Sequence, residues 1–380
     1  MQTEKQHCAD KTARAPASGQ DDNASAEEHA QSMIGLSQGM LKEVVEALDR
    51  IRRINRTIHI LSMNARVEAA RAGEAGRGFA VVAEQLSGLA ASTEQTAQGI
   101  EDTSKTITTE LNVVAERLSK DAIDNRLCDL ALNAIDLVDR NLYERSCDVR
   151  WWATDSAVVA AAKQPDDANL RYVAQRLGQI LDSYTVYFDL VLADLDGRII
   201  ANGRPRQWPH TAGASASGST WFRSALETRS GTQFGFESAH ASPLVGGQNV
   251  LVYSCVVREG GAVNGRPLGV LGIVFKWDAL GPETLRRIPL TRREAAITRA
   301  VIVDNDGRVL ADPDPQRVGQ DLGFDGMAAL FSQARGAATA RLDGAVWRIG
   351  HARSPGFETY ATGWHCLLMR QTRNGMSPMR

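Results

Sequence analysis

The sequence contains no long apolar run. In its 380 residues, no stretch approaches the roughly 18–20 consecutive apolar residues that a membrane-spanning helix needs. The first residues are polar, whereas a secretory signal peptide would be basic and then apolar. We therefore expect a soluble protein of the cytoplasm with no membrane span.

Cysteine is scarce, and the net charge is close to zero. The cysteines form no C-x-x-C pair and no regular framework, which favours reduced thiols over a disulfide scaffold. The 43 basic and 45 acidic residues leave a net charge of −2, so we expect no bulk attraction to nucleic acid. The five cysteines are Cys8, Cys128, Cys147, Cys255 and Cys366.

Motifs of enzyme chemistry are also missing. There is no G-x-S-x-G, no phosphate-binding glycine loop followed by Lys-Ser/Thr, and no H-E-x-x-H. His351, His365 and Cys366 invite comparison with a metal site, but no acidic residue supports them at a suitable spacing. We expect neither enzymatic activity nor a metal or cofactor.

Proline is absent between Ala17 and Gln164, so helices there can be long. Mostly apolar residues recur at alternating spacings of three and four, the heptad pattern of packed helices. The predicted seam consists of Ile54, Ile58, Leu61, Ala65, Glu68 and Ala72, and then Val82, Leu86, Leu89, Thr93, Thr96 and Ile100.

Three glycines interrupt this pattern at Gly73, Gly76 and Gly78. Glycine accepts the positive φ that a tight reversal needs, so the pattern predicts an antiparallel helical hairpin over residues 26–120 with its end at 68–79. Long hairpins leave one seam of each arm uncovered, and we expect two copies to form a four-helix bundle.

The segments around the hairpin follow from composition and from the missing proline. Residues 1–25 are too polar to bury a core and are predicted to be a disordered tail. The second arm is predicted to continue as a connecting helix over 121–163, ending at Lys163. Trp151 and Trp152 are expected to dock it on the domain that follows.

Beyond Pro165, strands separated by glycine-rich turns replace the heptads. Residues 190–201 and 300–313 share a pattern of strand, Asp-Gly turn and strand, an internal repeat that predicts two lobes. We place these at 164–285 and 297–370, with a tail at 371–380, and the fold class is α+β. Expected elements include a helix over 221–226 and strands over 187–192, 249–257, 268–277, 340–349 and 363–369.

The hairpin end has a nearly unbroken set of characteristic residues: Asn64, residues 68–74 (EAARAGE), residues 76–83 (GRGFAVVA) and Leu89–Ala90. In these residues it resembles the signalling tip of bacterial methyl-accepting chemotaxis proteins. In that family the tip contacts neighbouring receptor dimers, the coupling protein CheW and the histidine kinase CheA. The resemblance therefore implies these partners, with possible higher-order receptor clusters. The residues expected at the interface are Asn64, Glu68, Arg71, Gly73, Glu74, Gly76, Arg77, Gly78, Phe79 and Val81.

Some positions depart from the family pattern. Arg56 stands where the family usually has a large apolar residue, and Arg66 replaces a small one. These departures favour an alternative, a ligand-binding or dimeric scaffolding protein whose hairpin no longer couples to the kinase. Glu27–Glu28 and Glu94–Gln95 resemble methylated pairs of the family, but they lie too near the tip, and we expect them to be a solvated face.

The C-terminal part is similar to the double Cache sensor domain, a PAS-like ligand-binding fold. The similarity lies in the long leading helix, the two aspartate-glycine hairpins, the Trp221–Phe222 pair and residues 269–273. It implies a ligand pocket in the first lobe, for which the candidate residues are Trp221, Phe236, Glu237 and Tyr253. Their aromatic wall with one carboxylate suits a small organic or cationic ligand. The alternative is that these aromatic residues form ordinary core.

An amino acid is not the favoured ligand, because Ser219 and Thr220 precede Trp221 where the family's carboxylate-binding arginine motif is expected. The sequence as a whole predicts a chemoreceptor-like signalling protein with its hairpin first and its sensor domain last.

Overall fold

The structure is a computed structural model that describes residues 22–372, with side chains from residue 28. It divides into two compact units, residues 1–123 and 124–380. The predicted tail over 1–25 lies almost entirely outside the described residues, as does most of the tail over 371–380. Among the residues described, no helix combines the length and the apolar character needed to cross a membrane.

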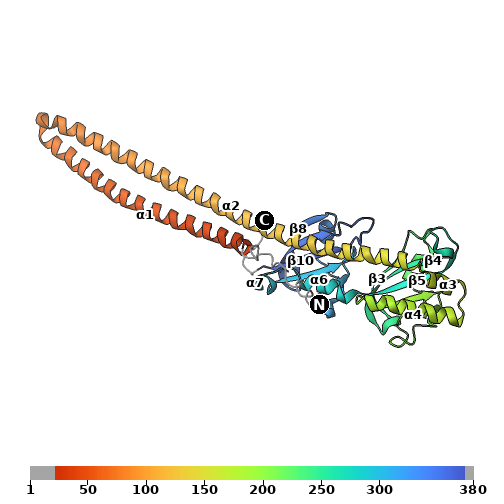
Figure 1. The fold of residues 1–380 in the computed structure, drawn as a ribbon. Helices are drawn as coiled ribbons and strands as arrows, with labels where there is room; N and C mark the ends of the chain where they lie inside the picture. The colour runs from red at the N-terminus through yellow and green to blue at the C-terminus, as the bar shows by residue number, and fades with distance from the viewer. Residues whose placement is uncertain (1–21, 373–380) are drawn as a thin grey trace, which may run out of the picture. The chain divides into compact units, whose positions relative to one another are not determined.

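The first unit is the predicted helical hairpin. Helix α1 (Asp22–Arg71) and helix α2 (Arg77–Trp152) meet at the short 3-10 helix η1 (Gly73–Gly76), and the arms run alongside each other (Figure 1). The helical pattern begins at Asp22, four residues before the predicted start.

Small side chains line the space between the two arms. The buried residues recur every seven positions, as expected for a heptad seam. They are Asn55, Ser62, Ala69, Gly76, Ala83, Ala90 and Ala97. The predicted seam was wrong in phase, because Ile54 and Leu61 are each 62% exposed and Val82 and Leu89 are exposed as well. Small residues let the helices approach closely, so the larger apolar residues face outward.

Polar contacts join the arms within this seam. The Asn55 Nδ2 donates to the Ala90 carbonyl oxygen at 2.8 Å. The Arg52 guanidinium reaches across to Glu94 at 3.2 Å and to Glu101 at 2.8 Å. Glu94, part of a pair resembling a methylation site, is therefore engaged in an ion pair between the arms.

The connecting helix is shorter than predicted. Helix α2 ends at Trp152, and a separate helix α3 (Ser156–Lys163) follows, so the expectation of one helix reaching Lys163 was wrong. The Asp155 carboxylate accepts a hydrogen bond from the Ala157 amide at 2.9 Å and thereby starts the new helix. Helix α4 (Asp167–Ser183) then leads into the first sheet.

The first lobe is an antiparallel sheet in the order β2-β1-β5-β4-β3. Helix α5 (Thr220–Leu226) packs on one face through Trp221 and Phe222, which join the valines of the central strands. The strands are β1 (Tyr187–Ala193), β2 (Ile199–Asn202), β3 (Gly235–Ser242), β4 (Gln248–Arg258) and β5 (Pro267–Lys276), with 3-10 turns η2 (Pro243–Val245), η3 (Glu259–Gly261) and η4 (Trp277–Ala279).

The second lobe repeats this topology in the order β7-β6-β10-β9-β8, as the internal repeat predicted. Its strands are β6 (Thr298–Val303), β7 (Val309–Ala311), β8 (Arg335–Leu342), β9 (Ala345–Arg353) and β10 (His365–Gln371). Helices α6 (Gly281–Arg286) and α7 (Arg292–Ala295) precede β6. The 3-10 helix η5 (Pro315–Arg317) and helix α8 (Met327–Phe331) lie between β7 and β8.

The expected strand over 340–349 is in fact the hairpin of β8 and β9. Asp343 and Gly344 form its turn with φ of 53° and 76°. This is the same aspartate-glycine signal that identified the two other hairpins, and it was overlooked here because apolar residues continue on both sides.

Candidate functional site

The end of the hairpin depends on two glycines for different reasons. Gly73 adopts a φ of +62°, a conformation that other residues rarely take. Gly76 is buried, and a Cβ atom built on it would lie 2.2 Å from the Ala69 carbonyl oxygen. At Gly78, by contrast, an added Cβ would meet no atom of the described residues within 4 Å. The close approach of the arms therefore requires glycine at 76 but not at 78.

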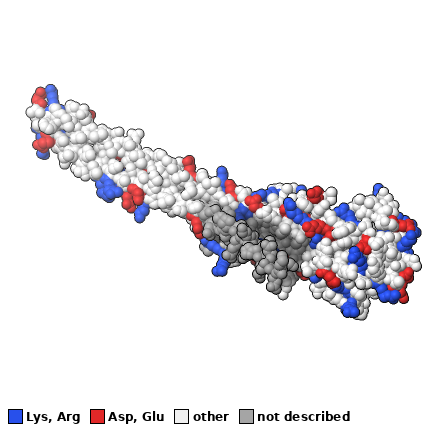
Figure 2. Space-filling model, viewed as in Figure 1, with Lys and Arg blue, Asp and Glu red and all other residues white. Residues whose placement is uncertain are grey.

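Charged side chains surround this end. Glu68 pairs with Arg71 at 3.5 Å, and Glu74 pairs with Arg77 at 2.6 Å. All four side chains are at least three-quarters exposed, so the pairs contribute little to stability. Figure 2 shows both signs of charge gathered at the hairpin end. The charges are thus available for contact with another protein.

Apolar side chains accompany the charges. Phe79 is 73% exposed, and Val81 is also exposed. A small apolar centre with a polar rim is the usual composition of a protein interface. All ten residues predicted for the tip lie in the described part of the chain, and nine of them are exposed, with Gly76 as the buried exception.

A longer apolar surface follows both arms, and the sequence analysis assigned part of it to the intrachain seam. Exposed hydrophobic area on this scale marks an interaction surface. Figure 2 shows a long stretch of the hairpin with few charges. The exposed residues are Leu36, Met40, Ile51, Ile54, Ile60, Leu61, Met63 and Val67 on α1, and Val82, Leu89, Ile100, Ile107, Leu111, Val113, Val114 and Leu118 on α2; we call them the outer stripe.

In the first lobe, the four predicted ligand residues fall into two pairs. The Glu237 carboxylate accepts a hydrogen bond from the Trp221 amide at 3.1 Å at the start of α5. The rings of Phe236 and Tyr253 face each other across neighbouring strands at 5.0 Å. Because successive strand residues point to opposite faces, the sheet separates the two pairs. Trp221 is 1% exposed and Tyr253 is fully buried.

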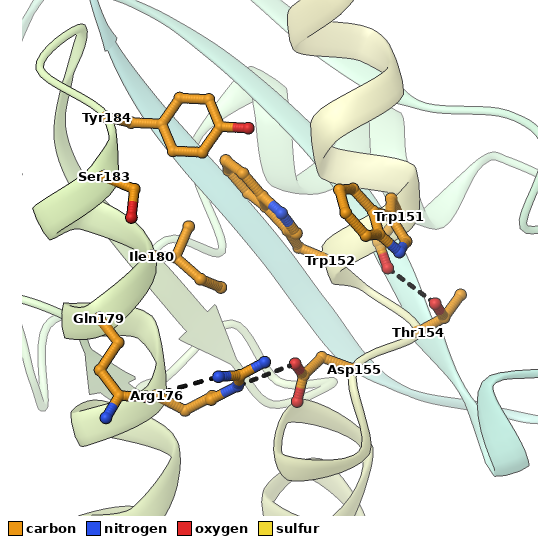
Figure 3. Close-up of a pocket in the computed structure, with 9 residues that line it drawn as sticks. All are labelled: Trp151, Trp152, Thr154, Asp155, Arg176, Gln179, Ile180, Ser183 and Tyr184. Atoms are coloured by element: carbon orange, nitrogen blue, oxygen red, sulfur yellow. Dashed lines mark hydrogen bonds and ion pairs between the residues drawn. The ribbon is translucent and has the colours of Figure 1, made fainter. Parts of the chain in front are cut away.

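An open cleft of about 580 Å³ lies elsewhere in this lobe, between the end of α2 and helix α4. Figure 3 shows Trp151, Trp152 and Tyr184 along its aromatic side. At its other end Arg176 and Asp155 form an ion pair at 3.3 Å. Trp152 is buried against Tyr184, as the docking prediction required, but Trp151 is 70% exposed.

The sequence analysis missed this cleft. Its lining comes from two segments, 151–155 and 176–184, that carry no shared motif. The adjacent tryptophans were its one visible signal, because a helix surface with two large aromatic residues in succession cannot bury both against the same neighbour.

A buried carboxylate organises the loop after β2. Asp189 accepts hydrogen bonds from the Asn202 side chain at 2.7 Å and from the Gly203 and Arg204 amides at 2.9 and 3.0 Å. Burial raises the pKa of Asp189 to about 6, against the lowering effect of these hydrogen bonds. Its hydrogen bonds to the Gly203 and Arg204 amides hold the backbone of this loop in place, which indicates a structural role.

The histidines considered for a metal site are paired in the second lobe. His351 Nε2 and His365 Nδ1 lie 2.7 Å apart, and Phe331 stacks on His365 at 4.0 Å. Burial lowers the pKa of each imidazole to about 4. Over residues 22–372, no group of three or more His, Cys, Asp or Glu side chains is arranged to hold a metal ion.

Comparison with known proteins matches both parts of the chain. Residues 80–378 match the Cache domain family, and residues 8–134 match the methyl-accepting chemotaxis protein (MCP) signalling domain. Both resemblances inferred from the sequence are confirmed. The two matches share residues 80–134, which form part of α2.

Individual relatives cover short stretches. Methyl-accepting chemotaxis protein PcaY of Pseudomonas putida is 44% identical over 73 residues, which is 19% of this chain and 13% of that protein. Methyl-accepting chemotaxis protein CtpM of Pseudomonas aeruginosa is 49% identical over 61 residues, 16% of this chain and 11% of that protein.

Among solved structures, the sensor domain of the Vibrio cholerae histidine kinase DctB aligns with a TM-score of 0.53 and 12% identity. It covers 67% of this chain and 99% of that domain. At this identity the similarity shows the fold alone.

Proposed function

The chain belongs to the Cache domain family and combines this domain with an MCP signalling domain, and from these two assignments we propose that it is a chemoreceptor-like signalling protein. In this proposal, the Cache domain binds a small ligand and the hairpin end contacts CheW and the histidine kinase CheA. The proposal includes a cytoplasmic location.

The observation that carries the proposal is the exposure of the hairpin end. Phe79 and Val81 are exposed beside the four charged residues Glu68, Arg71, Glu74 and Arg77. No stability requirement explains this composition, because exposed ion pairs contribute roughly 0–1 kcal/mol and an exposed phenylalanine contributes no burial. Recognition of another protein does explain it.

The outer stripe supports a homodimer within this proposal. Pairing two hairpins would cover apolar residues that a single hairpin leaves in water. The result would be a four-helix bundle in which the small-residue seam joins the arms of one chain and the outer stripe joins the two chains.

Helix α2 supplies the route between ligand and hairpin end. It is one helix from Arg77 to Trp152, and its last residues line the cleft beside α4. We propose that ligand binding in the first lobe shifts the C-terminal part of α2. The small organic or cationic ligand and the roles of Trp221, Phe236, Glu237 and Tyr253 remain predictions.

The coupling claim is tested by capture of CheW and CheA from the same host. The intact chain is expected to retain both, and Phe79→Ala is expected to reduce capture at least about tenfold, in line with the loss of an aromatic interface residue. Tyr172→Ala is the matched control, because Tyr172 is an exposed helical aromatic residue in the other unit. Failure of the intact chain to capture either protein would remove the coupling claim.

The ligand claim is tested by a thermal-shift screen of small metabolites against the full chain. A ligand at 100 times its dissociation constant should stabilise the folded state by about 2.7 kcal/mol. Trp221→Phe and Trp151→Ala then distinguish a site at the α5 face of the sheet from a site in the cleft, because each variant alters only one of these places.

A second candidate function is a dimeric scaffolding or ligand-binding protein with an uncoupled hairpin. It is favoured by Arg56 and Arg66, which are both exposed and add positive charge to the first arm. Comparing CheA activity with and without the protein in reconstituted receptor arrays separates the two functions. Unchanged kinase activity together with retained dimerisation would support the scaffold.

A further inference from the structure

The loop between β9 and β10, residues 354–364, contacts both the first lobe and helix α2; we call it the clasp loop. All of these contacts lie within the compact unit of residues 124–380. They involve a buried carboxylate on the helix and a cluster of aromatic residues on the sheet.

The contact with α2 is centred on Asp139, which is fully buried. Its carboxylate accepts four hydrogen bonds, all from the clasp loop. Ser354 Oγ donates at 2.6 Å, the Gly356 amide at 2.9 Å, and Thr362 donates through Oγ1 at 2.8 Å and through its amide at 3.3 Å. Burying a carboxylate costs free energy unless hydrogen bonds fill its acceptor positions. Separating the loop from the helix would lose these hydrogen bonds, so they stabilise the contact.

Aromatic contacts extend this attachment along the helix. The Phe357 ring meets Tyr143 edge-on at 5.3 Å, and the Arg140 guanidinium lies 4.5 Å from the centre of the same ring. Arg140 and Tyr143 are one and four residues beyond Asp139. The clasp loop therefore contacts α2 over residues 139–143, which is more than one helical turn.

The contact with the first lobe is made by Tyr360 and Trp364, which flank Thr362 in the same loop. Tyr360 and Tyr253 of β4 share a hydroxyl–hydroxyl hydrogen bond at 2.5 Å. Trp364 lies 6.4 Å from Phe236 of β3 and 5.3 Å from Trp277 after β5, measured between ring centres. Two of the predicted ligand residues, Phe236 and Tyr253, thus face the clasp loop.

We infer that the clasp loop couples the first lobe to helix α2. A change in the packing of β3 and β4 must move Tyr360 and Trp364, and it thereby disturbs the donors that satisfy Asp139. Because losing one donor leaves a buried charge poorly satisfied, the loop tends to hold all four hydrogen bonds or to release the helix. Together with its contacts to both parts, such all-or-none behaviour would give the loop the two discrete arrangements that coupling requires.

The experiment measures amide hydrogen exchange of the full chain without ligand. Asp139→Asn replaces one of the two acceptor oxygens with an NH2 donor, which then faces either the Gly356 amide, bound to Oδ2 in the native chain, or the Thr362 amide, bound to Oδ1. We expect exchange at least about tenfold faster in the clasp loop and also in β3 and β4 around Phe236 and Tyr253. Tyr253→Phe removes only the hydroxyl group and should produce the reciprocal change in α2 around residues 139–143.

The controls are Asp121→Asn, an exposed aspartate of α2, and Tyr172→Phe, an exposed tyrosine of α4. Both should leave exchange in β3, β4 and the clasp loop unchanged. One contrary result, in the Asp139 or the Tyr253 variant, is faster amide exchange that is confined to the element that carries the substitution. That result would overturn the inference. Equal acceleration in all peptides, including β1 and β7, would show a purely structural role and would also overturn it.

If Asp139→Asn does not fold, Tyr360→Phe provides the same comparison, because it keeps the ring and removes one hydroxyl group. The inference is a route for the ligand response in the proposed function, but its test uses no ligand and no kinase. Loss of the coupling would leave CheW capture and ligand binding unaffected, so the two claims fail independently.

Discussion

The paired histidines of the second lobe show how neighbouring groups fix a tautomer. The Asn305 side-chain oxygen lies 3.0 Å from His365 Nε2, which must therefore carry a proton. His365 Nδ1 is then the acceptor, and His351 Nε2 is the donor. His351 Nδ1 is left buried, and no partner for it occurs among the described residues. Protonating either ring would add a positive charge in a buried place, and the nearby positive charge of Arg353 opposes this as well.

This arrangement predicts acid sensitivity. Both imidazoles have a pKa of about 4 in the folded chain and about 6.5 in the unfolded chain, so the unfolded state binds more protons between these values. Stability is full above pH 6.5 and falls as the pH drops toward 4, by on the order of 3 kcal/mol for each ring. Urea unfolding between pH 4 and 7 measures the loss.

His351→Phe should flatten this pH dependence, because it removes one titrating ring and keeps an aromatic ring against Phe331. His210 is exposed, and His210→Gln should leave the slope unchanged. A slope that is the same in the wild type and in His351→Phe would contradict the assignment.

Gly76 gives a second prediction at the scale of one residue. An alanine Cβ there would lie 2.2 Å from the Ala69 carbonyl oxygen, so the arms would have to separate. Gly76→Ala should destabilise the hairpin by about 1–3 kcal/mol, the usual cost of overpacking. Circular dichroism of thermal unfolding measures it.

Gly78→Ala is the control for this substitution, since the added methyl group meets no described atom and alanine favours helix. Equal destabilisation by the two substitutions would contradict the steric explanation. It would show that the turn needs the backbone flexibility of glycine at both positions.

At the scale of elements, the hairpin carries two apolar surfaces with different tasks. The seam of small residues brings α1 and α2 of one chain together, and the outer stripe remains in water. Spacing alone does not separate these surfaces, because exposed pairs such as Ile54 and Leu61, or Val82 and Leu89, are seven residues apart and each directly precedes a seam residue.

Substitutions in the outer stripe should weaken self-association without unfolding the hairpin. Leu61→Lys and Leu89→Lys replace side chains that are about 60% exposed in a single chain. Burying a leucine contributes roughly 1.5–3 kcal/mol, so each change should raise the dimer dissociation constant at least about tenfold. Sedimentation equilibrium measures this, with Gln31→Lys as a control of equal charge at an exposed position. An unchanged dissociation constant would assign the dimer contact to another surface.

At the scale of the whole molecule, the two units differ in what stabilises them. The unit of residues 124–380 has two sheets with buried cores of its own. The core of the hairpin is a narrow line of small residues, and its larger apolar residues are exposed. We therefore expect association to stabilise the hairpin and to affect the two-lobed unit little.

This difference predicts two thermal transitions. The transition of the hairpin should move to higher temperature as protein concentration rises, because association stabilises the folded state by mass action. The transition of the two-lobed unit should keep its midpoint. Scanning calorimetry at two concentrations that differ at least tenfold measures both. A single transition, or equal shifts of both, would contradict this division.

Features that depend on neighbours in the chain were determined by the sequence itself. The heptad spacing, the glycines at 73 and 76 and the aspartate-glycine turns each act within a few residues, so the hairpin, its end and the repeated lobes were predictable. The location of the ten tip residues at the hairpin end was predictable for the same reason, because they are close together on two arms joined by one turn; their contact with partners stays a prediction.

The tertiary structure alone decided which surfaces are covered. The choice between the two helix stripes depends on how closely the arms approach, and the end of α2 at Trp152 depends on packing against Tyr184 and Tyr187. Asp139 and the clasp loop lie more than 200 residues apart in the sequence. Contacts at such separations leave no local pattern, because they arise only when the folded chain brings buried polar groups to their partners.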